Sequence, residues 1–270
     1  MGKVLVFGSF VVDLMSRTPH LPVPGETVKG SVFKMGPGGK GFNQGVAAHK
    51  AGADLVMVTK LGKDTFGNVA LETMKNLKMN ADYIFQTDEA ETGTALIMVD
   101  ENTSQNEIVV VLGSCNQITD QEVDSLSPVL EESEYLLTQL ETNVSAVERI
   151  VALAEKKGVK VILNPAPVQK ISDTVLSKID IITPNEVEAE ILTGIPVTDE
   201  ENAKKAADWF MDKGVKSVII TLGGRGVYVA SEEQRKLIPA FKVNAIDTTG
   251  AGDAFNGGLV TALAEDKDLF

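Results

Sequence analysis

The sequence predicts an α/β fold, a three-layer sandwich built on a mostly parallel central sheet with a small separate β-sheet. Short segments of continuous apolar residues alternate with amphipathic segments of helical period, which is typical of parallel strands covered by helices on both faces. Two stretches, at about 10–35 and 92–116, instead alternate in polarity and have no helical period. We expect these stretches to form the small sheet, and residues 1–270 to form a single domain.

The elements of the main body follow from the hydrophobic pattern. Apolar strands are expected at residues 3–7, 55–59, 135–139, 159–163, 181–183 and 217–222. Helices are expected at residues 66–77, 144–157, 186–192, 201–213 and 254–264. Gly158 and Gly214 directly follow two of these helices, as glycine commonly does at a helix end.

The composition argues against several classes of partner. A net charge of −13 disfavours nucleic acid and acidic membranes, because both select basic surfaces. No apolar run approaches the ~20 residues that a membrane-spanning helix needs. Cys115 is the only cysteine, so the sequence offers no disulfide framework, and we expect a cytoplasmic protein with small-molecule ligands.

A glycine-rich segment near the C-terminus is the strongest candidate site. Residues 247–258 read DTTGAGDAFNGG, a loop of small residues that runs into a helix. The backbone N–H groups of Gly250, Ala251 and Gly252 would point at one place, where the helix dipole also favours an anion. Asp253 would stand beside that anion and could take a proton from a hydroxyl that attacks a bound phosphoryl group. The alternative is an acidic residue that simply stabilises the helix N-terminus.

This segment resembles the C-terminal signature of the ribokinase-like (phosphofructokinase-B) sugar kinases, and the resemblance covers nearly the whole chain. The other matching motifs are GGKGFN at residues 38–43, NPAP at 164–167, TPNEVE at 183–188 and TLGGRG at 221–226. The resemblance implies a ribokinase-like fold in which the small sheet is a lid. It implies ATP as the phosphoryl donor, Mg²⁺ as the ion that accompanies it, and a homodimer formed through the lids. It also implies that Asp253 is the catalytic base, with Gly250, Ala251 and Gly252 holding the transferred phosphoryl group.

The resemblance further implies two cation sites. Asn185 and Glu188 match a motif that acts near Mg²⁺ and the phosphates, with Glu188 holding the ion through water. The alternative is a capping box, because Asn185 precedes a helix and Glu188 follows three residues later. Asp247 and Thr249 match part of a monovalent-cation site, so K⁺ is a candidate second ion, while an Asp that caps the loop is the alternative.

The nucleotide-binding turn is expected after the last predicted strand. Thr221, Gly223, Gly224 and Gly226 match the family's nucleotide-cradling residues, although a plain hairpin turn also explains the glycines. The P-loop pattern G-x-x-x-x-G-K-[ST] is absent from the sequence, so the nucleotide would be held in another way.

The sugar is expected between the lid and the main body. Asp13, Gly39, Lys40, Asn43 and Glu141 match the family's sugar-binding positions. A carboxylate can accept hydrogen bonds from two vicinal hydroxyls, which suits the two acidic residues. For Glu141 the alternative is a cap of the helix that begins at residue 144.

Two departures from the family pattern affect these expectations. Val11 stands in the sugar site where the family usually has Asn, so one hydrogen bond to the sugar is missing and the identity of the sugar is open. The chain stops at Phe270, whereas family members continue for several elements that help to form the adenine pocket. We therefore expect a C-terminally short domain.

The expected function is ATP-dependent phosphorylation of the hydroxymethyl group of a small sugar, with D-ribose as first candidate and ribose 5-phosphate as product. Deoxyribose, fructose, ketodeoxygluconate or a nucleoside are alternative acceptors, and a catalytically impaired binding protein is the alternative if the C-terminus is truly absent. Residues 36–41 also read G-x-G-x-x-G, the fingerprint of an NAD-dependent oxidoreductase. That fingerprint should directly follow the first strand, and here it follows the alternating stretch, so we assign it to the sugar pocket.

Overall fold

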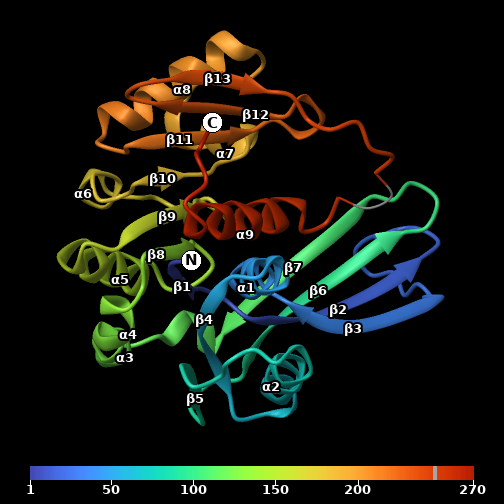
Figure 1. The fold of residues 1–270 in the computed structure, drawn as a ribbon. Coiled ribbons are helices and arrows are strands. Elements are labelled where there is room, and N and C mark those ends of the chain that lie inside the picture. Colours follow the sequence, from blue (N-terminus) through green and yellow to red (C-terminus); the bar gives the residue numbers. More distant parts are fainter. Residues whose placement is uncertain (246–247) are drawn as a thin grey trace.

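The computed structural model describes residues 1–245 and 248–270, which form a large sheet covered by helices and a smaller sheet that stands apart from it (Figure 1). Within these residues the strands of the large sheet lie in the order β13 (Arg235–Ile238), β12 (Val227–Ser231), β11 (Ser217–Thr221), β10 (Ile181–Ile182), β9 (Lys160–Asn164), β8 (Tyr135–Gln139), β1 (Lys3–Phe7), β4 (Asp54–Gly62) and β5 (Ile84–Thr87). This arrangement confirms the predicted α/β class and the mostly parallel central sheet.

All neighbouring strands from β11 to β5 pair in parallel, and β12 and β13 add an antiparallel edge. The central strand β1 shows why the sequence pattern predicts this sheet. Its residues from Val4 to Phe7 are all fully buried, because helices cover both faces of the sheet and leave no polar side to the strand.

The helices divide into two layers (Figure 1). One face of the large sheet packs against α1 (Lys40–Ala51), α2 (Thr65–Leu77) and α9 (Ala251–Ala264). The other face packs against α3 (Asp120–Ser125), α4 (Ser127–Glu131), α5 (Val144–Lys157), α6 (Asp173–Leu176), α7 (Glu186–Thr193) and α8 (Glu200–Asp212). None of the helices in the described part of the chain combines the length and apolar character that a membrane crossing requires.

The smaller sheet contains four strands, in the order β3 (Val32–Gly38), β2 (Val11–Thr18), β6 (Thr92–Asp100) and β7 (Asn106–Gly113). Strands β2 and β6 pair in parallel, and the two outer strands pair with them in antiparallel fashion. Exposed apolar side chains on this sheet include Phe33, Met35, Leu96, Ile108, Val109, Val110 and Val111.

Some elements differ from the sequence-based expectation. The short strands β5, β12 and β13 and the helices α3, α4 and α6 were not predicted. The three helices span only four to six residues, which is too few to show a helical period. The helix α9 begins at Ala251, three residues before the segment expected at 254–264, and Asp253 lies in its first turn as expected.

Helices α1 and α9 approach each other closely because α9 carries Gly257 at the contact. A Cβ atom at this position would lie 2.5 Å from the Ala47 Cβ and 2.7 Å from the Ala48 nitrogen. Only a residue without a side chain allows this distance between the two helix backbones. The neighbouring Gly258 has no such constraint, because a Cβ there would meet nothing within 4 Å.

Gly257→Ala should therefore lower the free energy of unfolding by about 1–3 kcal/mol, as expected for overpacking of a buried contact. Gly258→Ala is the matched control and should raise the free energy of unfolding by up to about 1 kcal/mol, because alanine favours the helix. Urea unfolding of both variants measures the difference, and equal effects at the two positions would contradict the close packing.

Candidate active site

A polar hollow of about 180 Å³ opens at the carboxyl ends of the central strands, where α1, α7 and α9 all begin. Its lining includes Lys40 from α1, Asn185 and Glu188 from the start of α7, and Thr221 from the end of β11. Residues 250–253, at the start of α9, complete one wall. Motifs that are far apart in the sequence therefore meet at one place, at the sheet edge where α/β proteins bind ligands.

The start of α9 supplies an anion site. Gly250 precedes the helix with φ of 72°, a left-handed conformation that suits glycine, and Ala251 is the first helical residue. The N–H groups of the first turn of a helix have no partner within the helix, and the helix dipole adds partial positive charge there. Gly250, Ala251 and Gly252 all line the polar hollow, so an anion bound in it would meet the positive end of the helix, although the Ala251 N–H also donates to the Thr248 carbonyl at 3.1 Å.

Asp253 lies at the boundary between this hollow and a second one. The second hollow has a volume of about 700 Å³ and lies between α1, α2, α9 and the smaller sheet. Asp13 and Asn43 line it together with Asp253, which is only 8% exposed. A single carboxylate therefore faces both an anion site and a separate hollow, and two neighbouring side chains hold it. Asn43 Nδ2 donates to its Oδ2 at 3.1 Å, and Gln44 Nε2 donates to its Oδ1 at 3.0 Å.

Glu141 is buried and connects the turn after β1 to the start of α1. Its Oε2 accepts hydrogen bonds from the Ser9 hydroxyl at 2.5 Å and from the Lys40 backbone N–H at 2.8 Å. The residue that precedes α5 as its N-cap is Asn143, so Glu141 does not cap that helix. These bonds hold the start of α1 against the end of β1 and use one of the two carboxylate oxygens.

Asp13 extends from β2 into the larger hollow and is half-buried. Burial raises the pKa of Asp13, and the negative charge of Glu141 raises it further. Gly38 allows this position, because a Cβ at residue 38 would lie 2.3 Å from the Asp13 Oδ1. Val11 shares its face of the strand with Asp13 and is 2% exposed, next to Gly93 of β6.

The GGKGFN segment packs its backbone directly on the turn after β1. Gly39 has φ of 93°, and a Cβ there would lie 2.9 Å from the Phe10 Cα. A Cβ at Gly41 would lie 2.6 Å from the Gly8 backbone. The glycines therefore bring the start of α1 close to the sites of Asp13 and Glu141. Lys40, which was expected to contact the sugar, lines the polar hollow beside Glu188.

Asn185 and Glu188 form a reciprocal capping box at the start of α7. Asn185 Oδ1 accepts from the Glu188 N–H, and Glu188 Oε2 accepts from the Asn185 N–H, both at 2.8 Å. Burial raises the pKa of Glu188, and the negative charge of Asp253 raises it further. The hydrogen bond from the Asn185 N–H and the positive charge of Lys40 act in the opposite direction but do not cancel the rise. The capping alternative is therefore present, and both residues also line the polar hollow.

The TLGGRG segment connects β11 to β12 as a hairpin, the alternative considered for its glycines. Gly226 has a local reason to be glycine, because a Cβ there would lie 2.0 Å from the Ile238 carbonyl oxygen. Gly223 and Gly224 are exposed, and a Cβ at either would meet nothing within 4 Å. Thr221 is the residue of this motif that lines the polar hollow.

The predicted cation residues are only partly described. Thr249 lies at the edge of the larger hollow, next to Gly250. Asp247 lies outside the described residues. Within 1–245 and 248–270, no group of three or more His, Cys, Asp or Glu side chains is arranged to hold a metal ion by itself.

Three buried amide side chains behind Asp253 were not predicted as functional: Gln44, Gln139 and Asn256. A buried amide carries no sequence signal of its own, although Gln44 directly follows GGKGFN and Asn256 lies within DTTGAGDAFNGG.

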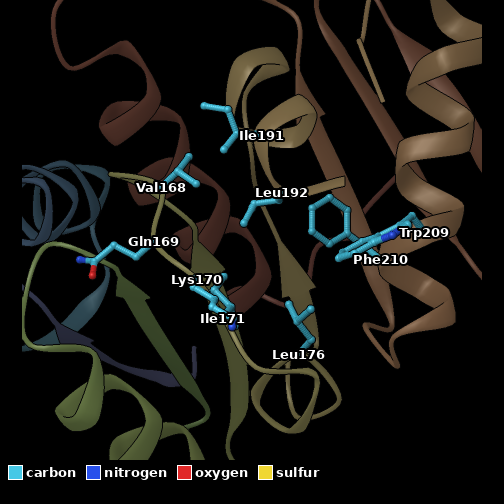
Figure 2. A pocket seen from close by; sticks show the side chains of 9 residues that line it. All are labelled: Val168, Gln169, Lys170, Ile171, Leu176, Ile191, Leu192, Trp209 and Phe210. Atoms are coloured by element: carbon cyan, nitrogen blue, oxygen red, sulfur yellow. The ribbon is translucent and has the colours of Figure 1, made fainter. Parts of the chain in front are cut away.

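Figure 2 shows another hollow of about 390 Å³, distinct from the polar one, between α6, α7 and α8. Its lining is largely apolar and includes Val168, Ile171, Leu192 and Trp209. None of the predicted site residues that the structure describes lines it, so we do not include it in the candidate active site.

The chain is similar to known proteins over its whole length. The family described as "pfkB family carbohydrate kinase" matches residues 1–269. The ribokinase of Haemophilus influenzae is 45% identical over 270 residues, which cover 100% of this chain and 88% of that protein. The deoxyribokinase of Salmonella typhi is 36% identical over 267 residues, covering 98% of this chain and 87% of that protein. The structure of Arabidopsis thaliana ribokinase complexed with ribose and ATP superposes with a TM-score of 0.90 at 28% identity, covering 99% and 87% of the two chains.

The raised pKa of Asp13 predicts that Asp13→Asn stabilises the protein at neutral pH. An acid whose pKa is raised by folding holds its proton more tightly in the folded state, so stability falls as pH rises from the ordinary value through the raised one. The gain should therefore be present at pH 7 and vanish towards the ordinary pKa of about 3.9.

Urea unfolding of Asp13→Asn across that pH range measures this gain. Asp212→Asn, at the exposed end of α8, is the control and should change little. A loss of stability in Asp13→Asn at neutral pH would show that the Asp13 carboxylate is stabilising.

Proposed function

Because the chain belongs to the pfkB family of carbohydrate kinases, we propose that it transfers the γ-phosphoryl group of ATP to the hydroxymethyl group of D-ribose, giving ribose 5-phosphate. The observation that supports this proposal most strongly is the position of Asp253, which lines both the polar hollow and the larger hollow. A base at that boundary can take the proton of a sugar hydroxyl while the hydroxyl oxygen attacks a phosphorus atom on the other side.

On the phosphate side, the N–H groups at the start of α9 and the Lys40 ammonium would stabilise the negative charge of the transferred group. Mg²⁺ fits the donor set here, although no protein cage surrounds it in the described residues. This ion usually keeps several waters and is bound by one or two carboxylates and the phosphates of the substrate. Glu188 uses one carboxylate oxygen in its capping box, which leaves the other oxygen for a water of the ion.

On the sugar side, Asp13 and the second oxygen of Glu141 would accept hydrogen bonds from the sugar hydroxyls. Asn43 and the backbone at Gly39 complete this side of the site. The smaller sheet stands over the larger hollow and would close as a lid, which excludes water as a competing phosphoryl acceptor.

The nucleoside part of ATP is assigned to the hairpin turn with Thr221, Gly223, Gly224 and Gly226. We also retain a K⁺ site that includes Asp247 and Thr249, which rests on the sequence resemblance. The exposed apolar side chains of the smaller sheet support a homodimer formed through the lids. A cytoplasmic location remains a prediction from the sequence.

A second acceptor, 2-deoxyribose, is favoured by Val11. This buried apolar side chain stands on the sugar-facing side of β2 and offers no hydrogen bond to a hydroxyl. A site that lacks a polar partner for one hydroxyl discriminates weakly against the sugar that lacks that hydroxyl. Comparing kcat/KM for ribose and 2-deoxyribose therefore measures how far Val11 has relaxed the specificity.

Asp253→Asn should lower kcat for ribose by about 10²–10⁴-fold, the usual contribution of a general base. The substitution keeps the size of the side chain and removes its ability to accept a proton. A coupled assay of ADP formation that requires ribose and Mg²⁺ measures the effect, with ribose, 2-deoxyribose and fructose as the sugar panel.

Asp212→Asn is the control and should retain the wild-type rate. Near-normal turnover by a folded Asp253→Asn variant would contradict the role of Asp253. A wild-type protein that forms no ADP with any sugar of the panel would contradict the proposed function itself.

A further inference from the structure

A chain of buried amide side chains runs behind the active site and ends on both the base and the anion site. Gln139 Nε2 donates to Gln44 Oε1 (2.7 Å), and Gln44 Nε2 donates both to Asp253 Oδ1 and to Asn164 Oδ1 (3.0 Å each). From there Asn164 Nδ2 donates to the Thr183 carbonyl (2.9 Å), and Thr183 Oγ1 donates to Asn256 Oδ1 (2.7 Å). The last bond is donated by Asn256 Nδ2 to the Gly252 carbonyl (2.9 Å). All of these side chains are at most 8% exposed. We call this set the amide chain.

The amide chain has a direction, and the Asp253 carboxylate sets it. An ionised carboxylate can only accept hydrogen bonds, so Gln44 must turn its NH₂ group towards Asp253. The Gln44 carbonyl then faces Gln139, which must in turn present its own NH₂ group. The remaining Gln139 oxygen packs against Gly8 and has no hydrogen-bond partner among the described residues. An unpaired buried acceptor is unfavourable, so the orientation of the Gln139 amide is explained by the bonds that begin at Asp253 and not by its own surroundings.

We propose that Gln44 is a positioning residue that fixes the orientation of the Asp253 carboxylate. The two carboxylate oxygens are held by consecutive residues of α1, Oδ1 by Gln44 and Oδ2 by Asn43. Asn43 lines the larger hollow, whereas Gln44 is fully buried and lines neither hollow. Gln44 therefore acts on the reaction through Asp253 and does not touch the substrates. Rotation of the carboxylate would break at least one of the two bonds.

The other end of the amide chain, at Asn256, holds the start of α9, which forms the anion site. Asn256 bonds to the carbonyl of Gly252 one turn earlier in α9, and Thr183 bonds to Asn256. The base and the N–H groups that face the phosphoryl group are thus tied to a common set of buried side chains. This matters because a displacement of about 1 Å between reacting groups can cost 10²-fold in rate.

The test compares two substitutions in the amide chain and rests on the proposed ribose kinase activity. Gln44→Met keeps the length of the side chain and removes its hydrogen bonds to Asp253 Oδ1 and Asn164 Oδ1, together with the one that Gln44 Oε1 accepts from Gln139. Gln139→Met is the matched control, because it removes one buried amide of the same chain and leaves the Gln44 bond to Asp253 in place. Steady-state kcat and KM for ribose and ATP are measured for both, together with the melting temperature.

We expect Gln44→Met to lower kcat about 10–100-fold, with both KM values within about threefold of wild type, because only the alignment of the base is lost. Gln139→Met should keep kcat within about threefold at a comparable melting temperature. Gln44→Glu is the second variant if Gln44→Met does not fold. It should also lower kcat, because an acidic group beside Asp253 either repels the carboxylate or shares a proton with it.

If the wild-type protein phosphorylates ribose, either of two results would overturn the proposed role of Gln44. One is a kcat within threefold of wild type for a folded Gln44→Met or Gln44→Glu variant. The other is an equal loss of kcat in Gln139→Met, which would assign the effect to general packing. A wild-type protein that is inactive on every sugar would instead refute the proposed function, and the inference would fall with it.

Discussion

The Asp253 carboxylate can meet Asn43 and Gln44 only because α1 and α9 approach each other closely, and Gly257 permits that approach. Both helices begin at the carboxyl end of the large sheet, so their close contact also fixes the distance between their first turns. The first turn of α1 carries the groups that hold the carboxylate, and the first turn of α9 carries the carboxylate and the anion site. Glycines at 39 and 41 seat the start of α1 on the turn after β1 in a similar way. Backbone contacts that only glycine allows thus determine the geometry of the proposed chemistry.

The same site concentrates negative charge. Asp13, Glu188 and Asp253 line two adjoining hollows, Glu141 is buried nearby against the Lys40 backbone N–H, and the cationic side chain of Lys40 lines the polar hollow. The raised pKa values of Asp13 and Glu188 show that burial there opposes ionisation. A polyanionic nucleotide could enter such a site only with a cation and with the N–H groups of a helix start. This electrostatic requirement agrees with a kinase that binds ATP together with Mg²⁺.

The sequence predicted the alternation of strands and helices because continuous apolar segments and helical periods are strong signals over five or more residues. It could not predict β5, β12 or β13, which have four or five residues and lie at or next to an edge of the sheet. Motifs predicted which strand ends and helix starts carry the site, because glycines and acidic residues at fixed spacings are visible in one dimension. They did not predict that Lys40 lies beside Glu188, which depends on where α1 starts relative to α7. They also missed Gln44 and Gln139, because the role of a buried amide depends on partners about 95 to 210 residues away.

The proposed role of Asp253 requires the sugar hydroxyl to lie beside its carboxylate, and a crystal structure with ribose, ADP, Mg²⁺ and aluminium fluoride would show whether it does. The fluoride group mimics the transferred phosphoryl group between donor and acceptor. We expect the ribose C5 hydroxyl within about 3 Å of an Asp253 carboxylate oxygen, and the fluoride within hydrogen-bond distance of N–H groups at the start of α9. A hydroxymethyl group that points away from Asp253, or a fluoride bound elsewhere than at α9, would contradict it.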